Sequence, residues 1–196
     1  KIMPIAINGS GTITGVSVGG LPDGIVDEDM LAANAVTAPK IGPKVFTSYA
    51  VIVDQKSANT EAGTFTSGAW QTRILQTKYD EDGIVSSISS NKFTLAAGNY
   101  FIVWSAPCYK VDKNQSRLYD VTNSAQITPL GSVEHAGTSQ SVQVRSIGAV
   151  RVTPSGSTEY RIEHQSAATR ADNGFGFAGN LATAEIFTIV EIYKEA

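Results

Sequence analysis

The stretch SISSNKFTLAAGNYFIVWSA, residues 87–106, indicates the fold class of this chain. From residue 99 onward it is rich in β-branched and aromatic side chains, which pack well on a pleated surface and favour a strand. The cluster Ala96-Ala97-Gly98-Asn99 supplies the small and flexible residues of a tight turn just before that strand. We therefore expect a turn followed by a strand, since the apolar residues show no helical period.

The same succession of strand-like runs and turn clusters continues through residues 46–196. The strand-like runs are residues 73–79, 99–107, 142–152, 159–164 and 184–194. The turn clusters are residues 80–83, 96–99, 154–157 and 171–174. Short strands at this spacing predict an all-β sandwich or barrel. The absence of any internal repeat of about 20–50 residues argues against a β-helix or a solenoid.

Residues 1–45 have a different character. Two β-branched runs flank an Asn- and Gly-rich turn in residues 1–19, which predicts a short β-hairpin. Residues 20–44, GLPDGIVDEDMLAANAVTAPKIGPK, carry apolar residues too sparsely for a self-contained helix. Asp27 can cap one short helix, whereas Pro39 and Pro43 prevent a longer one and favour an extended spacer. The 196-residue chain is therefore divided into an N-terminal segment, 1–45, and a globular domain, 46–196.

Composition and charge argue against several classes of protein. Hydrophobic residues make up 42% of the chain, which is enough for an ordinary core. The net charge is −3 and no basic tract occurs, whereas nucleic-acid binders carry a basic stripe. No apolar run reaches the 18 or so residues of a membrane helix, so we expect no membrane insertion. The single cysteine, Cys108, excludes an internal disulfide framework and is interpreted as a buried structural thiol.

The opening stretch also resembles the globular heads of the complement and tumour-necrosis-factor type. In that family a Lys-Phe-Thr run is followed by a Gly-containing turn and a Tyr/Phe strand. The matching residues here are Phe93, Gly98, Tyr100 and Phe101. The resemblance spans about residues 48–194, and Leu95-Ala96 stand where the family pattern has a proline. It implies a jelly-roll sandwich head over residues 46–196 and assembly as a homotrimer.

Residues 20–42 resemble the spacer segments of bacteriophage tail-fibre and related virion proteins, and such fibres often end in a trimeric jelly-roll head. A short segment that exposes apolar side chains needs something to cover them. Three copies around an axis would bury the candidate trimer contacts, which are Ile25, Leu31, Val36 and Ile41. The resemblance implies a protein of the virion surface that attaches to other virion proteins through residues 1–45.

The sequence holds no recognisable catalytic or cofactor motif. It lacks a Gly-x-Ser-x-Gly elbow, and His135, His164 and one cysteine are too few for a zinc site. We interpret His135 as a loop residue and His164 as a strand position. Residues 80–83, Asp-Glu-Asp-Gly, begin like a calcium loop but lack its later ligands, which favours a solvated hairpin turn. We predict no enzyme, no cofactor and no metal, although some heads of the resembled type bind calcium near the trimer axis.

Surface recognition is the function that these observations favour. Exposed aromatic side chains flanked by polar groups commonly bind sugars and proteins. The candidate contacts, each of which has a core or subunit-interface position as its alternative, are Trp70, Tyr109, Tyr119, Phe175 and Phe177. We predict a homotrimeric phage fibre or spike protein that binds a host-surface glycan or protein through many weak contacts. A purely structural capsid or tail decoration protein and a polysaccharide-degrading enzyme are the alternatives.

Overall fold

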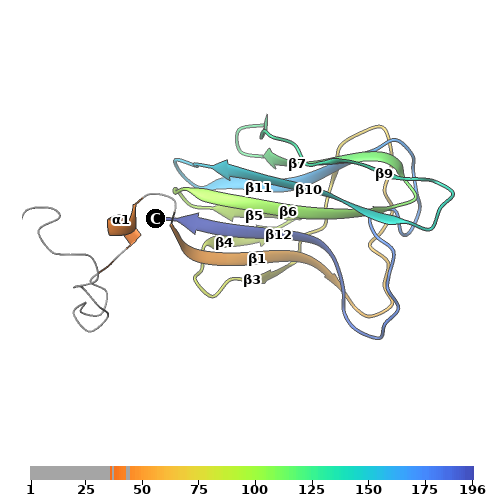
Figure 1. Ribbon diagram of the computed structural model, residues 1–196, viewed down its shortest axis with the longest axis horizontal. Helices are drawn as coiled ribbons and strands as arrows, with labels where there is room; N and C mark the ends of the chain where they lie inside the picture. The colour runs from red at the N-terminus through yellow and green to blue at the C-terminus, as the bar shows by residue number, and fades with distance from the viewer. Residues whose placement is uncertain (1–35, 37, 43–44) are drawn as a thin grey trace, which may run out of the picture.

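The computed structural model of the chain describes residues 36, 38–42 and 45–196, which form one helical turn and a β-sandwich (Figure 1). The helical turn, α1, spans Ala38–Ile41. The strands are β1 (Phe46–Lys56), β2 (Gln71–Thr72), β3 (Thr77–Tyr79), β4 (Val85–Ser89), β5 (Lys92–Leu95), β6 (Tyr100–Tyr109), β7 (Asp112–Asp120), β8 (Ala125–Gln126), β9 (Val133–Ala136), β10 (Gln143–Val152), β11 (Thr158–Ser166) and β12 (Glu185–Glu195).

These strands form two antiparallel sheets that face each other. The first sheet has five strands in the order β10-β6-β12-β1-β3. The second has seven strands, with the path β4-β5-β11-β7-β8, while β2 pairs with β11 and β9 pairs with β7. From β5 to β12 the long strands alternate between the sheets, and the first and last strands lie side by side. This is the strand order of a jelly roll, and the predicted all-β two-sheet sandwich is confirmed.

The opening stretch supplies the centre of this sandwich. Burial alternates along the first half of β6, with Tyr100, Ile102 and Trp104 pointing between the sheets. The Trp104 indole N–H donates to Ser116 Oγ across the core at 2.8 Å. Opposite Trp104 stands Gly148, where an added Cβ would lie 2.0 Å from the indole ring. The Trp104 indole therefore fits into the core because Gly148, its cross-strand partner, has no side chain.

Residues 73–79 depart from the single strand predicted for them. β2 ends at Thr72 on the seven-stranded sheet, and β3 begins at Thr77 on the five-stranded sheet. Residues 73–76 cross between the sheets, and Arg73 lies fully buried there. The turn at 80–83 likewise joins β3 and β4 in different sheets, so its prediction as a hairpin turn is wrong.

The two ends of the described chain lie at the same end of the sandwich. Ala196 N–H donates to the Val45 carbonyl at 2.9 Å, and α1 lies beyond this end (Figure 1). The loops between β1 and β2 and between β11 and β12 lie at the opposite end. The hairpin predicted in residues 1–19 and the helix predicted after Asp27 lie outside the described residues. Pro39 falls in the first turn of α1, a position that tolerates proline, and not in an extended spacer.

Candidate functional site

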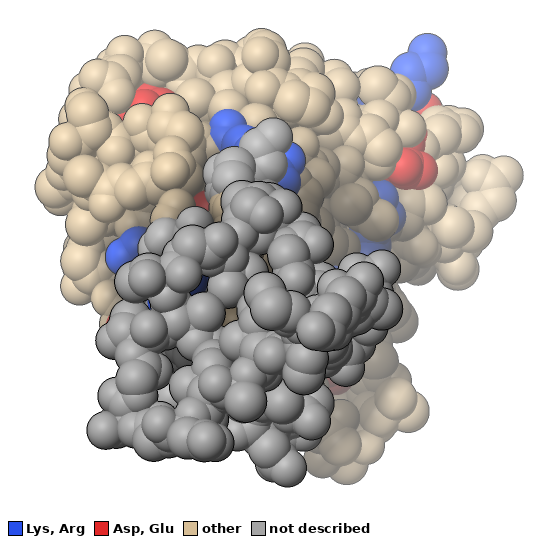
Figure 2. Space-filling view, turned by 60° about the vertical axis from the view of Figure 1, so that its left-hand side comes forward, with Lys and Arg blue, Asp and Glu red and all other residues tan. Residues whose placement is uncertain are grey.

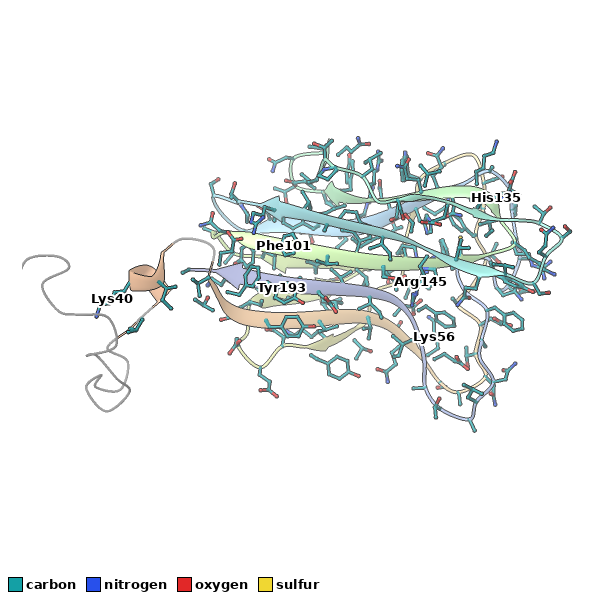
Figure 3. The ribbon with its side chains drawn as sticks, viewed as in Figure 1. Lys40, Lys56, Phe101, His135, Arg145 and Tyr193 are labelled. Atoms are coloured by element: carbon teal, nitrogen blue, oxygen red, sulfur yellow. The ribbon has the colours of Figure 1, made fainter. Side chains whose placement is uncertain are left out.

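The outer face of the five-stranded sheet carries a row of aromatic side chains. The strand register places Phe101 beside both Arg151 and Tyr193, and Tyr193 beside Tyr49. Cross-strand partners point to the same side of a sheet, so these four side chains share one face. The ring centroids of Tyr49 and Tyr193 are 4.8 Å apart, and the Phe46 ring lies 5.0 Å from Tyr193. Figure 3 shows Phe101 and Tyr193 on this sheet, near the end of the sandwich where the chain terminates.

The apolar surface extends over the neighbouring rows of the same face. The next row, read across β10, β6, β12, β1 and β3, is Ala149, Val103, Glu191, Val51 and Tyr79. Tyr79 is 57% exposed, and Ile147 on β10 is 53% exposed. We call these outward rows the apolar face. Figure 2, which views the molecule from the end where the chain terminates, shows a few Lys, Arg, Asp and Glu side chains among mostly uncharged ones.

The charged side chains within these two rows, Arg151 and Glu191, are each hydrogen-bonded to a neighbour. Arg151 Nε donates to Glu195 Oε1 at 2.6 Å, and the Tyr193 hydroxyl donates to Glu191 Oε2 at 3.0 Å. Burial first, and then the hydrogen bond to Glu191, raise the pKa of Tyr193 to about 12. Glu195 neutralises Arg151, whereas Glu191 keeps its negative charge beside the neutral Tyr193 hydroxyl. An exposed aromatic surface with few charges is typical of a protein–protein contact.

The outer face of the seven-stranded sheet has a different chemistry. Arg117 on β7 lies between two aromatic rings, with its guanidinium carbon 4.0 Å from the Trp70 centroid and 5.1 Å from that of Tyr119. Arg161 on β11 lies 4.9 Å from the Tyr119 centroid. One buried carboxylate, Glu163, accepts from Arg117 Nε at 2.7 Å and from Arg161 Nε at 2.8 Å. These five side chains form an aromatic–arginine ladder that has two positive charges and one negative charge.

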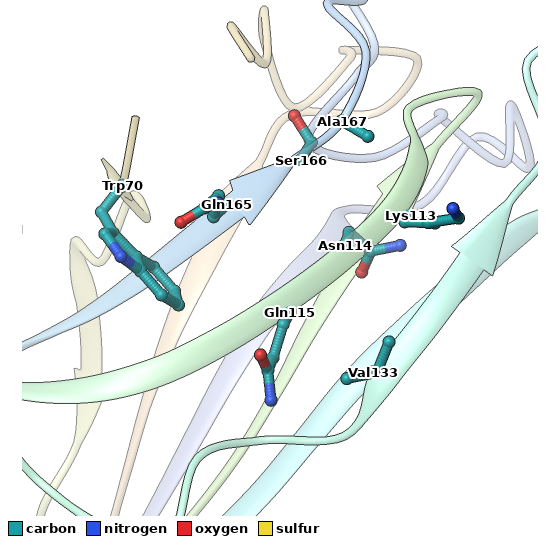
Figure 4. Close-up of a pocket in the computed structure, with 8 residues that line it drawn as sticks. All are labelled: Trp70, Lys113, Asn114, Gln115, Val133, Gln165, Ser166 and Ala167. Atoms are coloured by element: carbon teal, nitrogen blue, oxygen red, sulfur yellow. The ribbon is translucent and has the colours of Figure 1, made fainter. Parts of the chain in front are cut away.

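A shallow depression of about 230 Å³ adjoins the ladder at Trp70 (Figure 4). Its lining residues are Trp70, Lys113, Asn114, Gln115, Val133, Gln165, Ser166 and Ala167. The register pairs Gln165 with Gln115 and Gln115 with Val133, so these three side chains form one row across β11, β7 and β9. Trp70 stands at the Gln165 end of the row, because the next residue, Gln71, pairs with His164. We call this hollow the Trp70 depression.

The structure thus brings two of the five predicted aromatic contacts, Trp70 and Tyr119, onto one surface. Tyr109 and Phe177 form a separate pair, with ring centroids 4.9 Å apart. Phe177 is 44% exposed, whereas Tyr109 is only 7% exposed and takes the core position that was its alternative. Sequence reasoning missed Arg117, Arg161 and Glu163, which connect Trp70 to Tyr119. The alternation in residues 159–164 could have placed Arg161 and Glu163 on one face, but no local signal ties them to Arg117.

The structure corrects the prediction that Phe175 is a surface contact, because its side chain is buried within its own chain. Its ring lies 4.6 Å from Phe65 by centroid, and the Arg73 guanidinium carbon lies 4.1 Å above it. The glycines on either side allow the chain to turn this ring inward, where it joins a small second core near the distal loops. In this Gly-rich loop Phe175 is therefore buried, whereas Phe177, two residues later, is exposed.

Buried polar groups surround this second core. Arg73 Nε donates to Thr188 Oγ1 and its Nη2 donates to the Phe175 carbonyl, both at 2.8 Å. Burial lowers the pKa of Arg73 to about 9, although the charge of Asp54 opposes this shift. His164 is completely buried, and burial together with the Arg73 charge lowers its pKa well below 6.5. The side chains of Arg73, Thr188 and His164 do not reach the surface, so they act in packing and not on a ligand.

The N-terminal candidates divide between described and undescribed parts of the chain. Val36 and Ile41 are 53% and 62% exposed, so the sandwich does not cover them. Ile25 and Leu31 lie outside the described residues. The predicted trimer contacts therefore stay a prediction.

The acidic and histidine motifs have structural roles. Asp80 Oδ1 and Oδ2 accept the backbone N–H groups of Ile84 and Val85, each at 2.9 Å, so this carboxylate orders the turn between β3 and β4. His135 lies on β9 with Nε2 2.8 Å from Asp112 Oδ1, so its prediction as a loop residue is wrong. Within residues 36, 38–42 and 45–196, no group of three or more His, Cys, Asp or Glu could hold a metal ion. The described part of the chain also holds no helix of the length and apolarity needed to cross a membrane.

Comparison with known proteins gives a likeness in fold. No protein-family profile matches the sequence, and no curated protein matches it either. The globular domain of zebrafish complement 1qA protein is similar at a TM-score of 0.47, with 15% identity, 75% of this chain covered and 96% of that domain covered. A crystal structure of murine APRIL at pH 8.0 is similar at a TM-score of 0.46, with 8% identity, 75% of this chain and 98% of that chain covered.

Proposed function

We propose that this chain is a homotrimeric virion fibre or spike protein whose head binds the host cell surface. The observation that carries the proposal is the apolar face. Tyr49, Phe101 and Tyr193 form a continuous aromatic row there, and no other element of the described chain covers it. Leaving such a surface in water costs about 25 cal/mol per Å² of apolar area, which another protein surface would recover.

Copies of the same chain are the partner that this surface suits best. The Arg151 charge is paired with Glu195, and the carboxylates Glu191, Glu81 and Asp82 lie among or beside the aromatic side chains, so most of the face is apolar. Val36 and Ile41 are exposed as well, and α1 lies beyond the end of the sandwich where the chain terminates. The resemblance of the spacer to phage tail fibres favours three copies about one axis.

This arrangement leaves the opposite sheet free for a ligand. Both ends of the described chain lie at one end of the sandwich, so the N-terminal segments of three copies would project together toward other virion proteins. The aromatic–arginine ladder and the Trp70 depression would then face outward from the axis. Three such sites per fibre would raise weak single-site affinity through multivalency, which a host-attachment protein needs.

The proposal is tested with the labelled full-length chain and a panel of bacterial strains. We expect saturable adsorption to a subset of strains, and we expect surface glycan purified from an adsorbing strain to inhibit it. Cryo-electron microscopy of the parent particle should place the protein at the tip of a fibre or spike. Lack of adsorption to every strain, with the protein located in the capsid shell, would indicate a decoration protein instead. Release of reducing sugars from the glycan would indicate an enzyme.

A further inference from the structure

We propose that the Trp70 depression is a subsite for a single saccharide ring that carries a carboxylate, such as a uronic acid. This inference rests on the proposed function, because it names the class of ligand that the head would bind. It follows from the shape of the depression, the chemistry of its floor and the charge at its rim.

The size and walls of the depression suit one sugar ring. Its volume of about 230 Å³ lies below the roughly 300–1,000 Å³ of pockets for drug-sized ligands. Trp70 and Val133 stand at opposite ends of the row and offer apolar surface to the C–H groups of a ring (Figure 4). The Arg117 guanidinium carbon also lies 4.0 Å from the Trp70 centroid and helps to hold the indole in place. The indole is therefore fixed before a ligand arrives, which lowers the entropy cost of binding.

The floor between these walls consists of two amides. Gln115 and Gln165 are cross-strand partners, and each amide can both donate and accept, as the hydroxyls of a sugar require. Gln115 Nε2 donates to the Gly131 carbonyl at 2.9 Å, which orients the amide and leaves Oε1 to accept from a hydroxyl. Gln165 is exposed, and its side chain makes no hydrogen bond to any described residue.

The charge at the rim favours an anionic sugar. Lys113 is the charged member of the lining, and it forms no ion pair within the described residues. The nearby Asp112 carboxylate lies 2.8 Å from His135 Nε2, and this contact is an ion pair only when the imidazole is protonated. The adjoining ladder adds one further net positive charge, because Arg117 and Arg161 share a single carboxylate. A carboxylate on the bound ring would meet this positive surface, whereas a neutral ring would not use it.

The test is a ¹⁵N NMR titration in which the Trp70 indole reports on the depression and the Trp104 indole serves as the control. The ¹⁵N-labelled full-length chain has two indole N–H signals, from Trp70 and from the buried Trp104, whose N–H donates to Ser116 Oγ. Methyl β-D-glucuronide and methyl β-D-glucoside are titrated separately, since they differ at the carboxylate. We expect the Trp70 signal alone to shift saturably with the glucuronide, and to show at least about five-fold weaker affinity for the glucoside. Rising salt should reduce this preference.

Matched variants separate charge and stacking from general effects. Lys113→Gln should equalise the affinities for the two sugars, whereas Lys110→Gln, on the neighbouring turn, should leave the preference intact. Trp70→Ala removes the reporter, so its effect is followed by the binding of an immobilised glucuronate oligosaccharide, which should be lost. Gln165→Ala, at an exposed position that does not endanger folding, should weaken the glucuronide at least about three-fold.

Three results would overturn the subsite. They are a Trp70 signal that does not respond, equal affinities for the two sugars in the unmodified chain, and equal effects of Lys113→Gln and Lys110→Gln. Cell adsorption is measured in parallel, so that the subsite and the proposed function can fail separately. Adsorption that persists in Trp70→Ala, or after periodate treatment of the cells, would reject the saccharide subsite and retain host binding. A Trp70 response without adsorption to any strain would retain the saccharide subsite and reject host binding.

Discussion

Replacing Glu163 by Gln tests whether one carboxylate holds the aromatic–arginine ladder together. The Glu163 side chain is 3% exposed and accepts from both Arg117 and Arg161. Gln has the same shape but no charge, so the substitution leaves two guanidinium groups beside each other without their common partner. We expect the variant to fold with a lower free energy of unfolding and a less ordered Trp70.

The magnitude follows from how far each partner is exposed. Removing one partner of a fully buried ion pair costs about 3–5 kcal/mol, whereas an exposed pair contributes about 0–1 kcal/mol. The Arg117 and Arg161 side chains are 14% and 31% exposed, so water can solvate part of each charge once the carboxylate is gone. We therefore expect Glu163→Gln to cost about 2–3 kcal/mol. With a slope near 2 kcal/mol per molar urea, the midpoint should fall by about 1–1.5 M.

The assay is urea unfolding at one fixed protomer concentration, because assembly contributes to the apparent stability. The matched control is Glu159→Gln on the same strand, since Glu159 binds Lys92 at 2.6 Å but is 38% exposed. This control should change the free energy of unfolding by less than about 0.5 kcal/mol. If Glu163→Gln has an effect no larger than the control, the shared carboxylate does not stabilise the ladder, and this reasoning fails.

Three further predictions concern the core. Gly148→Ala should cost at least about 2 kcal/mol by differential scanning calorimetry, because the new Cβ would lie 2.0 Å from the Trp104 ring, whereas Gly156→Ala, in open space, should change little. His164 has a folded-state pKa well below 6.5, so the neutral imidazole contributes fully to the free energy of unfolding above pH 6.5, and this contribution is lost as the pH falls. His164→Asn should therefore reduce the acid loss of stability by up to about 1.4 kcal/mol per pH unit, and an unchanged pH profile would contradict this. Burial raises the pKa of Cys108 to about 12, so iodoacetamide at pH 8 should label the native thiol at least about 100-fold more slowly than the urea-unfolded one, and equal rates would refute its burial.

The sheets were predictable from the sequence because their signal is local. Side chains alternate between the core and the outside along β6, so its composition and its turn at Gly98 reveal the strand. The break in residues 73–76 was not predictable, because Arg73 resembles an ordinary polar strand residue until its burial is known. The crossing between sheets depends on partners far along the chain, which a local pattern does not contain.

The candidate site was predictable only as separate residues. Trp70 and Tyr119 stand out as aromatic residues near polar ones, but Arg117 and Glu163 come together through the pairing of β7 with β11. That register is set by the whole sandwich, so no spacing in the sequence reveals it. Phe175 shows the converse error, since an aromatic residue in a Gly-rich loop fits a surface contact as well as a small second core.

The central claim is that the apolar face joins three copies of the chain, and its molar mass in solution tests this most directly. Sedimentation equilibrium of the full-length chain should give about 62 kDa, three times the 20.7 kDa of one chain. Val103→Glu, which places a charge in the middle of the face, should give 20.7 kDa, while Thr72→Glu on the other sheet should keep the trimeric mass. A mass of 20.7 kDa for the unmodified chain, or an unchanged trimer in Val103→Glu, would contradict the account.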